Sequence, residues 1–258
     1  MSKAAWNLPE VPAAQSPWDL DDNEERMPEN PTQGEACDVL KDVLRHHCAT
    51  RGVSALVGGH IALRWDPLRP RQGVDPDVYL IEPAPPLGVH IKSIRTWVKG
   101  YRPPRIAVEV VSESTAAIDY FDKPARYAQA KVRELWVFDP LLCGPGVDGA
   151  PYRLQVWRRK RGGWTRTYAG DGPARSDELG AWLVVTDAGM LLRIADDAEG
   201  TRLWPTEAEA ERAAKEAAMA EKEAERAAKE AAIAEKDTAL AEIARLRAAL
   251  ARRAPDHT

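Results

Sequence analysis

Two short apolar runs, DPDVYL at residues 75–80 and IAVEVVS at residues 106–112, each carry an acid within or beside them. Runs of this length and composition predict strands inside a sheet. A carboxylate on a buried strand costs free energy unless a partner compensates its charge, and a metal ion is one such partner. If the two strands are neighbours, Asp77 and Glu109 point at one ion. A second interpretation stays open, in which each acid caps a turn or pairs with an arginine.

The segment after the second run predicts a helix packed beside these strands. Ser112, Ser114 and Thr115 are suitable N-cap residues for it. Lys123 lies within this helix, and the apolar run at residues 134–139 then predicts a central strand. The helix is expected to turn its apolar residues toward the sheet: Ile118, Phe121, Ala125, Ala128 and Val132.

An Asp after a proline, a Glu in an apolar strand and a Lys on the next helix follow one another in this chain. In this order they resemble the restriction-endonuclease-like nucleases whose signature is written PD-(D/E)XK. More narrowly, the chain resembles the Uma-type family of "putative restriction endonucleases" over residues 35–205. The residues that carry the resemblance are 76–78, 108–112 with Ser114 and Thr115, Lys123 with Tyr127, and 134–140.

The resemblance implies an α/β fold, with a mixed β-sheet core flanked by helices, and a metal-dependent DNA endonuclease. Asp77 and Glu109 would hold Mg²⁺, while Lys123 would orient the attacking water and offset charge on the phosphate. The usual lysine of the superfamily lies two residues after the strand acid. Here that position is Val111, whose backbone carbonyl is a further candidate metal ligand.

Four other residues have two interpretations each. Asp75 is a second ligand or a turn residue before Pro76. Glu35 is a further acid of the site or a charge at a helix N-terminus. Tyr127 joins the site, by packing against Lys123 or by a hydrogen bond, or it packs in the core. Ser112 contacts a phosphate or caps the helix. A set of cations before and around the two runs is a candidate phosphate grip or a solvated surface: Arg64, Arg69, Arg71, Arg95, Lys99, Arg102 and Arg105.

Composition leaves a second class of function open. The formal net charge is −4, so no global positive field indicates a nucleic-acid partner. With Val111 at the usual lysine position, this charge favours a catalytically inactive module for binding or assembly. A nuclease acting on RNA or branched DNA is a third candidate. Three scattered cysteines, Cys37, Cys48 and Cys143, indicate reduced thiols in a cytoplasmic protein without a signal segment or a membrane span.

The chain divides into three parts by composition. Residues 1–34 predict a mobile N-terminal arm, residues 35–204 the nuclease-like domain, and residues 205–254 a coiled coil. Within the domain, residues 35–50 predict an amphipathic helix, and Gly58-Gly59 predicts a hairpin between two short strands. His46, His47 and Cys48 share that helix and fit no common zinc pattern. Later alternating segments predict strands that extend the sheet: residues 152–158, 164–169, 182–186 and 190–194.

The last part is rich in Ala, Glu, Lys and Arg, and the twelve residues from Glu211 recur from Glu225, two heptads later, with Ile233 in place of Met219. Alanine forms a heptad-spaced stripe along it, followed by a larger apolar stripe near the end: Leu240, Ile243, Leu246 and Leu250. This pattern predicts an oligomer, most simply a dimer. The alternative is a single solvated helix, because alanine side chains bury little area.

Overall fold

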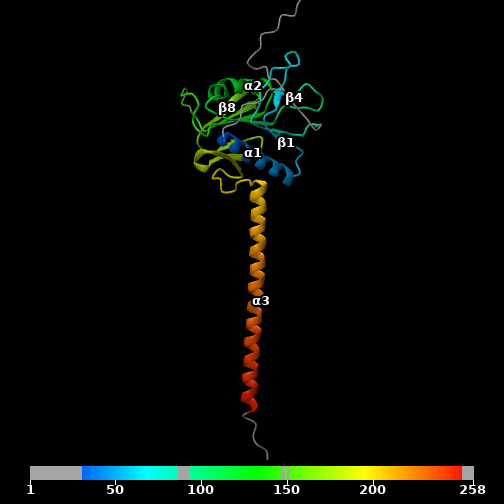
Figure 1. Cartoon of the computed structure of the whole chain (residues 1–258), viewed down its shortest axis with the longest axis vertical. Helices are drawn as coiled ribbons and strands as arrows, with labels where there is room; N and C mark the ends of the chain where they lie inside the picture. Colours follow the sequence, from blue (N-terminus) through cyan, green and yellow to red (C-terminus); the bar gives the residue numbers. More distant parts are fainter. Residues whose placement is uncertain (1–30, 87–92, 147–148, 150, 252–258) are drawn as a thin grey trace, which may run out of the picture. The chain divides into compact units, whose positions relative to one another are not determined.

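A six-stranded mixed sheet forms the centre of the domain that precedes Glu207 (Figure 1). The structure is a computed structural model that describes residues 31–86, 93–146, 149 and 151–251. Its strand order is β1-β3-β5-β6-β7-β8, and only β5 and β6 are parallel. Every residue of β5 and β6 is buried, as expected for strands covered on both faces. The strand bounds are β1 Leu56–Gly58, β3 Val78–Ile81, β5 Ile106–Val110, β6 Glu134–Phe138, β7 Leu154–Lys160 and β8 Gly163–Gly170.

The two faces of this sheet are covered by different helices (Figure 1). Helix α1, Pro31–Thr50, packs with Val78, Val108 and Trp136 in one core. The alternate residues of the same strands form a second core with α2, Lys123–Gln129. A π-helical turn, Ile118–Asp122, leads directly into α2. The architecture is therefore the mixed α/β class that the sequence predicts, and each face has its own set of side chains.

Helix α1 starts at Pro31, four residues before the predicted start at Glu35. Gln33, in this added turn, donates a hydrogen bond of 2.9 Å from Nε2 to the carbonyl oxygen of Val110. The predicted arm at residues 1–34 otherwise lies outside the described residues.

The predicted hairpin at Gly58-Gly59 is wrong. Strand β1 pairs with β3, whereas β2, Ala62–Arg64, pairs in parallel with β4, Ser93–Arg95. The glycines serve close packing, because a Cβ on Gly59 would lie 2.1 Å from the carbonyl oxygen of Asp77 and one on Gly58 would lie 2.5 Å from the Tyr79 hydroxyl. The Gly-Gly pair thus lets the chain pass beside the start of β3.

The β7–β8 hairpin extends the main sheet as predicted, but the later strands do not. β10, Ala181–Thr186, and β11, Leu191–Ala195, pair with each other and with β9, Ala174–Ser176, in a separate three-stranded sheet. Their inward residues Leu183 and Ile194 join the core that contains α1. This second sheet therefore helps to enclose the α1 side of the domain.

The described chain falls into two compact units, the first ending at Thr206 and the second beginning at Glu207. The second unit contains a single helix, α3, Glu207–Ala251, of 45 residues. The helix itself is confirmed, and its aliphatic side chains are exposed, among them Met219, Ile233, Leu240, Ile243 and Leu246. No helix in the described part of the chain is long and apolar enough to cross a membrane.

Candidate active site

Asp77 and Glu109 come from neighbouring strands, as their sequence context predicts. Asp77 immediately precedes β3, and the antiparallel register of Val78 with Val108 places it opposite Glu109. Its Oδ2 accepts a hydrogen bond of 2.7 Å from the backbone N–H of Val110. Both acids therefore lie on the face of the sheet that α2 covers.

Glu109 is fully buried and has a partner at each oxygen. The Lys123 ammonium donates to Oε2 at 2.6 Å, and the Tyr127 hydroxyl donates to Oε1. Lys123 and Tyr127 are one helical turn apart, so a single stripe of α2 supplies both contacts. Both interpretations of Tyr127 therefore hold: its ring is buried in the core, and its hydroxyl donates a hydrogen bond to Glu109.

A third carboxylate, Asp119, joins this cluster and is absent from the sequence prediction. It is 1% exposed, lies 2.8 Å from Lys123 Nζ, and accepts a hydrogen bond of 2.6 Å from the Thr115 hydroxyl. Asp119, Lys123 and Tyr127 follow at four-residue steps. That polar stripe is the sequence signal that would have identified Asp119.

The predicted inward face of this helix is therefore wrong for Ile118, Phe121 and Ala125, whereas Val132 is buried as predicted. Ile118 and Phe121 are 41% and 53% exposed, and Ala125 is exposed as well. Tyr120 and Tyr127 pack into the core instead. The acids on the sheet need a cation and a hydroxyl above them, and this requirement outweighs the burial of two apolar side chains.

Charge in the cluster is unequal, with three carboxylates around one ammonium. Burial raises the pKa of Glu109 well above its ordinary value. The Lys123 charge lowers this pKa, whereas the Asp77 and Asp119 charges raise it further. Burial by itself would lower the pKa of Lys123, but the neighbouring carboxylates raise it above its ordinary value. Lys123 is thus a fixed cation, and the remaining negative charge favours a further cation nearby.

The donor set fits a hard divalent cation. Carboxylate oxygens are the ligands that Mg²⁺ prefers, and each carboxylate oxygen in contact with Lys123 or Tyr127 retains a second lone pair. Val111, the third predicted ligand, is buried at the end of β5, and its N–H donates to Phe138. Among the described residues, no group of three or more His, Cys, Asp or Glu side chains is arranged to hold a metal. A cation here would therefore depend on few side chains.

His60, which the sequence prediction omits, is a neighbour of Asp77. Its Nδ1 lies 3.9 Å from Asp77 Oδ1, and its backbone N–H donates to the carbonyl oxygen of Pro76. Asp75 precedes Pro76 just before β3, and Glu35 lies in α1, whose buried side packs on the other face. Neither has a described ion pair with Lys123.

Two of the cations predicted to grip phosphate have structural partners instead. Arg64 is 3% exposed and donates to the carbonyl oxygen of Pro70 at 2.6 Å. Arg105 forms ion pairs with Glu82 and with Glu178. Their guanidinium groups hold loops against the domain and are not available to a ligand.

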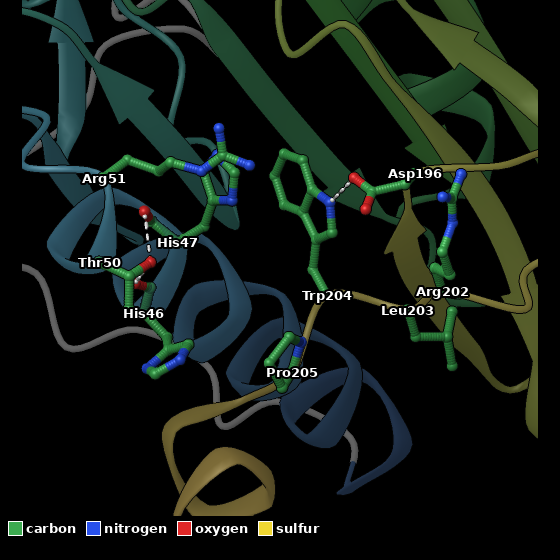
Figure 2. A pocket seen from close by; sticks show the side chains of 9 residues that line it. All are labelled: His46, His47, Thr50, Arg51, Asp196, Arg202, Leu203, Trp204 and Pro205. Atoms are coloured by element: carbon green, nitrogen blue, oxygen red, sulfur yellow. Dashed lines mark hydrogen bonds between the residues drawn. The ribbon is translucent and has the colours of Figure 1, made fainter.

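A pocket of about 240 Å³ lies apart from the acid cluster, at the end of α1 (Figure 2). The His47 imidazole stacks on the Trp204 indole with ring centroids 3.5 Å apart, and Trp204 Nε1 donates to Asp196 at 2.8 Å. Burial lowers the pKa of His47, which favours the neutral ring in this stack. The lining residues are His46, His47, Thr50, Arg51, Asp196, Arg202, Leu203, Trp204 and Pro205, and none is a predicted site residue.

The family comparison agrees with the resemblance inferred from the sequence. The profile of the Uma2 family, described as "Putative restriction endonuclease", matches residues 13–185. The crystal structure of a "putative nuclease belonging to DUF820" from Anabaena variabilis is 10% identical, with a TM-score of 0.43 over 61% of this chain and 78% of that chain. A search among curated proteins finds no match.

Replacement of the central cation is expected to destabilise the fold. Lys123→Met leaves Glu109 and Asp119 buried without their cation, so the free energy of unfolding should fall by about 3–5 kcal/mol. Urea denaturation followed by circular dichroism measures this change. Lys160→Met, at an exposed position, is the matched control and should change stability by less than about 0.5 kcal/mol. An equally small change in Lys123→Met would contradict a buried ion pair.

Proposed function

Because the chain belongs to the Uma2 family, we propose that it is a metal-dependent DNA endonuclease that hydrolyses phosphodiester bonds at the Asp77–Glu109 cluster. The observation that carries this proposal is the position of two acids on adjacent strands beside a buried lysine. Carboxylates and an ammonium in one site are the groups that phosphodiester hydrolysis requires.

Asp77 and Glu109 would hold Mg²⁺, with the Val111 carbonyl as a further ligand. When bound, the ion would supply Lewis acidity and neutralise charge on the phosphate. Water attacks phosphorus in line, a bond forms between the water oxygen and phosphorus, and the bond to the leaving sugar oxygen breaks. The attacking water gives up a proton to solvent, and the leaving oxygen takes up one from solvent. The protein's own groups assist as follows: Lys123 stabilises charge that builds on the phosphate, and Tyr127 fixes the orientation of Glu109.

Asp119 acts through Lys123 in this proposal. Its carboxylate lies 2.8 Å from the ammonium and is itself held by Thr115. The two carboxylates on Lys123 keep the side chain charged and limit its rotation. Asp119 is therefore a positioning residue, because it contacts the lysine and not the phosphate.

One observation favours a second candidate, a catalytically inactive nuclease-fold module. Both oxygens of Glu109 already have partners in Lys123 and Tyr127, so protein groups stabilise this buried carboxylate without a metal ion. In that case the acids serve the fold, and the protein binds or assembles without cutting. Metal-dependent nicking separates the two candidates.

The nicking assay uses supercoiled plasmid with Mg²⁺ and with EDTA. The wild type should nick only with Mg²⁺, and Asp77→Asn and Glu109→Gln should lose at least about a hundredfold in rate, as removal of a group that stabilises the transition state does. Asp122→Asn, at the exposed position beside Lys123, is the matched control and should nick like the wild type. Unchanged nicking in both acid variants would rule out the proposed site.

We further propose that α3 makes the protein a dimer through its exposed aliphatic side chains. Leu240, Ile243 and Leu246 are 46–54% exposed and recur at helical spacing, and burying them against a second helix would favour association. Two chains would bring two copies of the acid cluster into one particle.

Sedimentation equilibrium tests this assembly. The full chain should have about twice its 28.5 kDa mass, whereas a chain that ends at Thr206 and an Ile243→Glu variant should both be monomeric. A full chain that sediments as a monomer at high concentration would refute the dimer and leave a solvated helix.

A further inference from the structure

The hairpin of β7 and β8 is the most cationic stretch of the domain. Residues 157–166 read WRRKRGGWTR and contain five arginine or lysine side chains and no acid, in a chain of net charge −4. The tip, Lys160 to Gly163, is exposed. Positive charge is therefore concentrated locally on an acidic protein.

Two of the five cations have structural roles. Arg158 pairs with Glu134 and with Asp177, both at 3.0 Å. Arg159 donates to the backbone carbonyls of Ala128 and Val132, and so ties the hairpin to the end of α2.

The other three cations are exposed. Lys160, Arg161 and Arg166 form no ion pair with any carboxylate within the part of the chain that the structure describes. They are the positive charges of the hairpin that a ligand can reach.

Arg166 is held in place by aromatic rings. The strand register sets Trp157 opposite Arg166 and Arg159 opposite Trp164, so the four side chains alternate on one face of the hairpin. The Arg166 guanidinium lies 5.7 Å from the Trp157 ring centroid and 5.4 Å from that of Tyr152. Contact with a ring face orders a guanidinium without neutralising its charge, which lowers the entropic cost of binding an anion.

This face of the hairpin is also the face of the acid cluster. Trp157 and Trp164 pack against the core that contains Tyr127. Glu109, Val137 and Gln155 are successive partners across β5, β6 and β7. Gln155 accepts a hydrogen bond of 3.3 Å from Arg166 Nη1, which connects the hairpin's cation to the row that holds Glu109.

The spacing suits a nucleic-acid backbone. Strands β5 and β8 are separated by three inter-strand spacings, about 14 Å. Duplex DNA advances about 3.4 Å per phosphate along each strand, so this separation covers about four phosphates. A backbone lying along this face would meet the carboxylates at one end, where a bound cation would be needed, and the exposed Arg166 guanidinium at the other.

We propose that the β7–β8 hairpin binds the phosphate backbone of duplex DNA through Lys160 and Arg161 at its tip and through Arg166, which lies on the face that carries Asp77 and Glu109. The choice of DNA rests on the proposed function, whereas the surface itself rests on charge complementarity and on the aromatic support of Arg166. Lys160, Arg161 and Arg166 thereby take the phosphate-binding role that the sequence suggested for Arg64 and Arg105.

Fluorescence anisotropy of a labelled 20-base-pair duplex, titrated with the full chain in EDTA over a range of salt, tests this surface. The triple variant Lys160→Ala, Arg161→Ala, Arg166→Ala should bind at least about tenfold more weakly at low salt. Its plot of log affinity against log salt should be shallower by about 2–3, close to 0.9 for each lost phosphate contact. A second triple variant on α3, Lys215→Ala, Lys222→Ala and Lys229→Ala, changes net charge equally and should bind like the wild type.

The outcomes separate the surface from the chemistry. Hairpin-dependent binding by a wild type that does not nick plasmid in Mg²⁺ would support the surface and remove the nuclease proposal. Equal binding by the wild type and the hairpin variant, an equal loss in the α3 variant, or no binding by the wild type would overturn the surface. Tighter hairpin-dependent binding of an RNA duplex of the same sequence would overturn its assignment to DNA.

Discussion

The ammonium group of Lys123 lies between the buried carboxylates of Glu109 and Asp119, at 2.6 and 2.8 Å. Glu109 belongs to a central strand that is covered on both faces, so its charge needs a partner from the helix above it. The orientation of the π-helical turn and α2 follows from this need. Their polar stripe faces the sheet, and Ile118 and Phe121 face solvent.

The same face of the sheet unites features that are far apart in the sequence. The acid cluster lies over β3 and β5, and the aromatic and cationic side chains of the β7–β8 hairpin continue that face toward the sheet edge. The opposite face is closed by α1 and the second sheet and ends at the His47–Trp204 stack. The buried carboxylates and the Arg166 guanidinium thus lie on one side of the sheet, and apolar packing dominates the other.

Much of the fold could be predicted because apolar runs and glycine pairs report local structure. The strands that carry Asp77 and Glu109 are apolar enough to identify, and the Gly162-Gly163 pair does lie where β7 turns into β8, with Gly162 in the turn and Gly163 opening β8. Gly58-Gly59 is also a glycine pair between two short strands, but it does not form a hairpin turn. Gly59 is needed because the backbone of Asp77 packs against it, and only the tertiary structure creates this contact. Alternation likewise identifies β10 and β11 as strands without revealing which sheet they join.

The acid cluster was only partly predictable for a related reason. An apolar residue on a helix is expected to face the core, so Ile118 and Phe121 favoured the wrong face and concealed Asp119. A buried Asp–Lys–Glu group reverses that expectation, because charges that compensate one another can occupy the interior. The four-residue spacing of Asp119, Lys123 and Tyr127 carried the information, but its meaning depends on an acid from another strand.

The central claim is that Asp77 and Glu109 hold a divalent cation, and titration calorimetry with Mg²⁺ on the full chain tests it most directly. The wild type and Asp122→Asn should bind Mg²⁺ with one site per chain, and Glu109→Gln should give no binding heat, because it removes a ligand charge from the cluster. Circular dichroism of the same samples establishes that each variant is folded. Equal Mg²⁺ binding by folded Glu109→Gln and the wild type, or no binding by the wild type, would contradict the account and leave the acids with a structural role.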